Sequence, residues 1–256
     1  MRLDADTSGG TGQVRVILGA GCYLDAEAAL SLAVVLARQF SAELHGVFVR
    51  DEAILAATAG PLACVVSYSG NQVGDATGNA MLHAFQTDSR RFQRHLQARA
   101  REAALESSFR EETGRLPEAL QQAANAGDFV VYGLKPTIRI GGPLALVLGK
   151  GQVIPGFARR LAKQLDKTLV VLMPTGDATE TGTHLLATHH AERPPLVRFY
   201  DQPDALLQLL EQMSATATIL TAPRSALPPV YRILEAARSS VILAQEPKAE
   251  LSSPPD

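Results

Sequence analysis

The residues from Val14 to Glu52 constrain the fold more than any other part of this chain. An apolar run, VRVIL, meets the glycine turn Gly19-Ala20-Gly21, and then a long helical pattern and a second apolar run, ELHGVFV, follow. Two buried strands joined by one amphipathic helix form a right-handed βαβ unit, because a parallel crossover needs a connection of about this length. The pattern predicts an α/β fold whose ligands bind at the carboxyl ends of the strands.

The helix of this unit carries one buried stripe along its length. The apolar residues at helical spacing are Ala26, Leu30, Ala33, Ala37 and Phe40. Asp25 suits the N-cap position, and the helix should end near Phe40–Ser41.

Composition argues against several classes of protein. The hydrophobic share of 46% over 256 residues suits a globular chain with a real core. A net charge of −2 gives no general attraction to nucleic acid or to anionic membranes, and 5% aromatic residues leave little for a stacking surface. No apolar run approaches the roughly 20 residues of a spanning helix. Two cysteines and no signal-like N-terminus predict a cytoplasmic protein without a disulfide framework.

Beyond the first unit the pattern keeps alternating between strands and helices. A short helix follows Asp51, residues 60–79 indicate a loop, and a long helix spans about 79–106. The elements predicted after it are strand 107–112, helix 115–126, strand 128–134, helix 156–167 and strand 168–173, with a glycine-rich connection between 134 and 155. Together with the first two strands, they predict a complete, doubly wound five-stranded parallel sheet over 14–174.

The pattern restarts in shortened form after a polar linker. The strands LVRFY, ATILTAP and SVILAQ alternate with two helices over 195–246. This order repeats that of the last three strands of the first unit, which indicates a weak internal repeat. We therefore predict a smaller, truncated second α/β unit over 195–246, and disordered tails at 1–13 and 247–256.

With this order of elements the chain resembles the universal stress protein family in its tandem form. The segments that carry the resemblance are LARQFSAELHGVFVRDEAIL, FREETGRLPEALQQAANAGDFVVYGL and, as a degenerate second copy, ATILTAP with VYRILEAARSSVILAQ. The resemblance implies a sheet of order 3-2-1-4-5, of the adenine-nucleotide alpha-hydrolase-like type, with the two copies packed like a dimer. It also implies a role in stress response.

Members of this family that bind ATP carry an acidic residue after the first strand and a glycine loop after the fourth. In this chain Gly19 or Ala20 stands at the acidic position, and the second glycine of the loop falls on Pro136. Proline lacks the backbone N–H that a phosphate cradle uses, and no Gly-Ser or Gly-Thr pair follows. The resemblance therefore implies regulation through protein or small-ligand binding, with no catalytic residue, no required cofactor and no ATP hydrolysis.

The alternative is an adenine-nucleotide binder with at most slow hydrolysis. In the order 3-2-1-4-5 the first and fourth strands are neighbours at the switch point, so their ends would face one crevice. The candidate phosphate-binding residues are Gly19, Ala20, Gly133, Lys135, Arg139, Gly141 and Gly142. By the resemblance, the adenine of ATP or AMP would lie near Val47.

The other candidate sites are explained as solvent-exposed surface residues. Arg90, Arg94 and Arg101 share a helical face that acidic residues interrupt, which is typical of a solvated surface. The cluster of His184, His189 and His190 lacks metal-ligand spacing. We expect partnership between the two copies and with an unidentified protein, leave a homodimer open, and expect no nucleic acid, membrane or metal.

Overall fold

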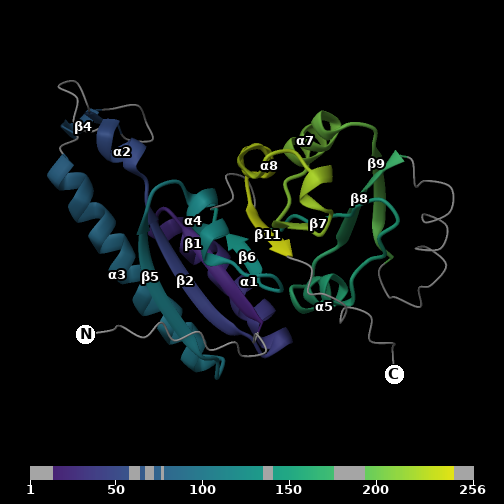
Figure 1. Cartoon of the computed structure of the whole chain (residues 1–256), viewed down its shortest axis with the longest axis horizontal. Coiled ribbons are helices and arrows are strands. Elements are labelled where there is room, and N and C mark those ends of the chain that lie inside the picture. The colour runs from purple at the N-terminus through teal and green to yellow at the C-terminus, as the bar shows by residue number, and fades with distance from the viewer. Residues whose placement is uncertain are drawn as a thin grey trace, which may run out of the picture.

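The structure is a computed structural model, which describes residues 14–57, 64–66, 72–75, 78–134, 141–175 and 194–244. These residues form a nine-stranded sheet with helices on both faces, and a small two-stranded sheet (Figure 1). The large sheet contains β1 (Arg15–Ala20), β2 (Glu43–Arg50), β5 (Ser107–Thr113), β6 (Phe129–Tyr132), β7 (Leu144–Val147), β8 (Leu169–Pro174), β9 (Leu196–Tyr200), β10 (Ala217–Leu220) and β11 (Ser240–Ala244). The small sheet pairs β3 (Cys64–Val66) with β4 (Gln72–Asp75).

The helices form two layers, one on each face of the large sheet. They are α1 (Tyr23–Phe40), α2 (Glu52–Ala57), α3 (Gly78–Glu102), α4 (Leu116–Ala123), α5 (Gly156–Gln164), α7 (Pro203–Gln212) and α8 (Val230–Ala237), with a 3-10 turn, η2 (Arg224–Ala226). Buried residues of α1, α3 and α5 share one hydrophobic cluster, and those of α4, α7 and α8 share the other. The α/β class that the sequence predicts is confirmed.

The strand order divides the large sheet into two parallel sets. The order is β5-β2-β1-β6-β11-β10-β7-β8-β9, and described neighbours run parallel except β6 and β11, which run antiparallel. In chain order the first set is 3-2-1-4, as predicted for the first four strands. The second set, β9-β8-β7-β10-β11, has the complete order 3-2-1-4-5.

The prediction was wrong at the fifth strand of the first unit. The predicted strand 168–173 is β8, and it lies between β7 and β9, not beside β6. The strand β7 was missed because the five apolar residues between Gly-Gly-Pro and Gly149, LALVL, form a run too short for periodicity to classify. β7 and β8 of the second set lie within the predicted unit 14–174, and β9, β10 and β11 lie within 195–246; among the described strands the first set has four and the second set five.

Smaller differences concern the ends of elements. Cys22, not Asp25, is the N-cap of α1. Asp25 lies in the first turn, where its negative charge interacts favourably with the helix dipole. The end of α1 at Phe40 is confirmed, with Ser41 in the left-handed conformation. The predicted loop 60–79 contains β3 and β4. None of the helices that the structure describes is long and apolar enough to cross a membrane.

The predicted tails at 1–13 and 247–256, like the histidines of the linker, lie outside the described residues.

The pairing of β6 with β11 can be tested by a crosslink. Val131 lies opposite Ile242 in the antiparallel register, and such pairs have Cα atoms about 4.5–5.5 Å apart, within disulfide range. In a chain with Cys22→Ser and Cys64→Ser, we expect Val131→Cys with Ile242→Cys to crosslink under mild oxidation, measured by mass spectrometry of the non-reduced protein.

The matched control is Val131→Cys with Val171→Cys, which would crosslink only if β8 lay beside β6. A bond in this control, and none in the first pair, would contradict the strand order.

Candidate functional site

The first switch point lies where β1 and β6 end side by side. The amide of Gly133 donates a hydrogen bond of 2.7 Å to the carbonyl of Gly19. A Cβ on Gly133 would lie 2.9 Å from the carbonyl oxygen of Asp25 and 3.1 Å from that of Gly19. Backbone therefore fills the space in front of Gly133, and glycine is needed there for close packing of β6 against the start of α1.

The N-terminus of α1 already holds a carboxylate. The amide of Tyr23, the first residue of the helix, donates to Oδ2 of Asp88 at 3.0 Å, and Asp88 comes from α3. This is the position where the exposed amides of a helix N-terminus would bind a phosphate. Asp25 adds a second negative charge in the first turn. An anion at this site would meet two carboxylates.

The same corner is fixed by the side chain of Tyr23, which is 4% exposed. Its hydroxyl donates to Oε1 of Glu27 at 2.6 Å and lies 2.8 Å from Nδ1 of His95. The guanidinium carbon of Arg91 lies 4.5 Å from the centre of the Tyr23 ring. Burial, followed by the bond to Glu27, raises the pKa of Tyr23, so the hydroxyl stays a donor near neutral pH. These contacts tie the start of α1 to α3.

The predicted residues on β1 and β2 serve the core. A Cβ on Gly19 would lie 2.4 Å from a methyl group of Leu120, so this glycine makes room for α4. Ala20 and Val47 are both 0% exposed, and Val47 lies opposite Gly19 in the sheet, in the cluster that α4 covers. Val47 is therefore covered by α4, although the nucleotide-binding alternative places the adenine beside it.

The structure does not bring Gly141 and Gly142 to the first switch point. A Cβ on Gly142 would lie 1.7 Å from the carbonyl oxygen of Ser214, and Thr216 Oγ1 donates to the Gly142 carbonyl at 2.7 Å. These contacts place Gly142 before β7, three strand positions from β6 and roughly 14 Å away at ordinary strand spacing. Lys135 and Arg139 lie outside the described residues.

A second switch point, which the sequence analysis missed, lies where β7 and β10 end. The Gln152 carboxamide accepts from the Gly149 amide at 2.7 Å and donates to the Thr221 carbonyl at 3.0 Å. Thr221 Oγ1 in turn donates to the carbonyl of Val147 at 3.1 Å. The side chain of Gln152 thus bridges the two strand ends. The glycines that follow the apolar run LALVL were the sequence signal for this turn.

Other reactive groups fit a structural role. Burial raises the pKa of the Cys22 thiol to about 11, so it stays protonated and unreactive at neutral pH. The described part of the chain contains no group of three or more side chains placed to hold a metal ion.

Comparisons with known proteins bear on this chain only weakly. No protein-family model and no curated protein sequence matches it. Among solved structures, a universal stress protein from Archaeoglobus fulgidus DSM 4304 is 11% identical, with a TM-score of 0.47 over 93% of this chain and 98% of that chain. A protein from the universal stress protein family of Burkholderia pseudomallei is 16% identical, with a TM-score of 0.26 over 74% of this chain and 98% of that chain. Likenesses at this level carry no argument about what this chain binds.

The role of Asp88 as the cap of α1 can be tested by substitution. Asp88→Ala leaves the Tyr23 amide without its partner, and loss of such a cap costs about 1 kcal/mol. We expect a decrease of that size in the free energy of unfolding, measured by urea denaturation. Asp88→Asn keeps an acceptor oxygen and should lose less. Glu102→Ala, on an exposed part of the same helix, is the control. Equal effects of Asp88→Ala and Glu102→Ala would rule out the capping role.

Proposed function

We propose that this protein is a non-enzymatic regulator of the stress-response type, which binds a partner protein or a small ligand and does not hydrolyse ATP. The observation that carries the proposal is the Asp88 carboxylate at the N-terminus of α1. A nucleotide at the first switch point would have to replace this carboxylate with its phosphates, close to Asp25. The electrostatic cost of that exchange favours a protein that works without a bound nucleotide.

The packing around Gly133 supports the same proposal. The phosphate loop of a nucleotide-binding fold needs open backbone amides, whereas the Gly133 amide is bonded to Gly19. Gly142, the other end of the candidate loop, packs against Ser214 at a distance from Gly133. Gly19, Gly133 and Gly142 of the proposed cradle thus pack closely against other parts of the chain, whereas Gly141 has open space around it.

The stress-response part of the proposal rests on the sequence resemblance and on the strand order 3-2-1-4 of the first set. A cytoplasmic location belongs to the same proposal, which leaves a homodimer open. The nucleotide-binding alternative now depends on Lys135 and Arg139, and the experiment below includes both.

We expect no rise in melting temperature when the purified protein is titrated with ATP, ADP or AMP to millimolar concentration, with and without Mg²⁺. A site that binds only the folded protein would add about 2.7 kcal/mol of stability at a hundredfold excess over Kd. The measurement is a thermal-shift titration by differential scanning fluorimetry.

Two variants decide where any binding would occur. A saturable rise that disappears in the double variant Lys135→Ala, Arg139→Ala would contradict the proposal and establish the nucleotide alternative. Asp88→Asn removes one negative charge but keeps an acceptor. A shift that appears only in this variant would support the view that the carboxylate excludes anions.

A further inference from the structure

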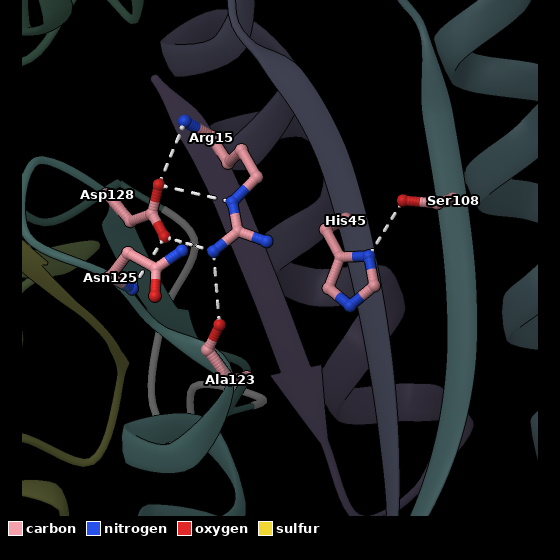
Figure 2. Close-up of polar contacts among 6 residues, drawn as sticks. All are labelled: Arg15, His45, Ser108, Ala123, Asn125 and Asp128. Atoms are coloured by element: carbon pink, nitrogen blue, oxygen red, sulfur yellow. Dashed lines mark hydrogen bonds and ion pairs between the residues drawn. The ribbon is translucent and has the colours of Figure 1, made fainter. Parts of the chain in front are cut away.

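A cluster of polar side chains lies on the sheet face that α4 covers, at the amino ends of the strands. α4 runs along the same face from Gly19, where Leu120 packs, to the cluster itself, where its last residue, Ala123, accepts a hydrogen bond from Arg15. The members of the cluster are Arg15 of β1, Glu43 and His45 of β2, Ser108 and Arg110 of β5, and Asp128 just before β6; several are drawn in Figure 2. Neither switch point uses these residues.

The centre of the cluster is a hydrogen-bonded chain from β2 to the edge strand β5. Nδ1 of His45 lies 2.7 Å from Oγ of Ser108 (Figure 2). The Ser108 hydroxyl donates to Oε1 of Glu43. The Ser108 hydroxyl has one proton, which it uses in its hydrogen bond to the Glu43 carboxylate, so toward His45 it can only accept. We therefore assign the imidazole proton to Nδ1, which donates to Ser108, and leave Nε2 without a proton.

Two cations and two anions act on the His45 ring from the surrounding elements. Arg110 comes from β5 and Arg15 from β1, while Glu43 and Asp128 provide the opposite charge. Burial, followed by Arg110 and Arg15, lowers the pKa of His45, whereas Glu43 and Asp128 act in the opposite direction. The folded protein therefore prefers the neutral ring.

The two arginines differ in how firmly they are held. Arg15 donates to Asp128 at 2.6 Å and also to the backbone carbonyl of Ala123, and Asp128 is 3% exposed (Figure 2). Arg110 is paired with Glu112, and both side chains are 40% exposed, so solvent screens that pair. A new positive charge in the cluster would displace Arg110 and β5 before Arg15 and β1.

We propose that the chain His45–Ser108–Glu43 is a proton-sensitive contact that holds the edge strand β5 on the sheet and loosens it in mild acid. The inference rests on the regulatory role proposed above. It adds that a fall in pH is the signal to which the regulator responds. The contact itself needs neither nucleotide nor partner.

The change is a proton added from solvent to Nε2 of His45. It places a third positive charge beside Arg15 and Arg110. Because the pKa of His45 is lowered in the folded state, the stabilisation is complete above the unfolded value of about 6.5 and is lost as the pH falls through the lower folded value. β5 is the strand that loosens, because in the described sheet it pairs with a single strand, β2.

The test is hydrogen exchange of the full chain at pH 7.5 and pH 5.0, corrected for intrinsic exchange rates. We expect a severalfold loss of protection in β5 at pH 5.0, with little change in β10 of the second set. His45→Gln keeps a donor for Ser108 but gains no proton in this range, so its β5 protection should not depend on pH. His83→Gln, an exposed histidine of α3, should behave like the wild type.

A second variant keeps the inference falsifiable if His45→Gln folds poorly. Arg110→Gln removes one of the repelling charges and should reduce the pH dependence in β5. The inference is overturned if β5 and β10 lose protection equally, or if β5 in His45→Gln responds to pH as in the wild type. Since no nucleotide is present, failure here leaves the proposed function intact, and a nucleotide-dependent thermal shift would leave this result intact.

Discussion

The antiparallel pairing of β6 with β11 is the contact on which the rest of the sheet depends. The first set of strands ends at β6, which has β1 on one side and would expose its other edge without β11. An exposed edge of four fully buried residues, Phe129–Tyr132, would favour association with other chains. β11 covers it from within the same chain, near the centre of Figure 1. The two halves therefore form one continuous sheet, in which neither half completes its hydrogen bonding alone.

The sequence was sufficient for the class of fold and for the longer helices and strands, because these follow from periodicity. Of the predicted stripe on α1, Ala26, Leu30, Ala33 and Ala37 are buried, and Phe40 is partly buried. Strand adjacency was harder to predict, since it depends on contacts far apart in the chain. The run LALVL was too short to classify, and without it the predicted strand 168–173, which is β8, was taken as the neighbour of β6.

The contacts of the candidate site were also hard to predict, because they too join residues far apart in the chain. Glycine at positions 19 and 133 was noticed, but its reason is packing against Leu120 and against the carbonyl of Asp25. Asp88 had no local signal, because it caps a helix that begins 65 residues earlier in the sequence. The partner of a helix N-terminus can be supplied from anywhere in the fold, so only the tertiary structure reveals whether that N-terminus is open.

Both switch points hold groups of the protein itself, in chemically different ways. At the first, the carboxylate of Asp88 and close backbone contacts occupy the position; at the second, the neutral carboxamide of Gln152 spans the strand ends. A carboxylate repels anions, whereas a carboxamide on a turn can be displaced at the cost of neutral hydrogen bonds. Of the two, the second is therefore the easier to open. The polar cluster around His45 lies beside the end of α4, and His45 and Ser108 are partly exposed, so a solvent proton can reach the imidazole without displacing another group. That difference favours regulation through the polar cluster of the first half over regulation through a ligand at its switch point.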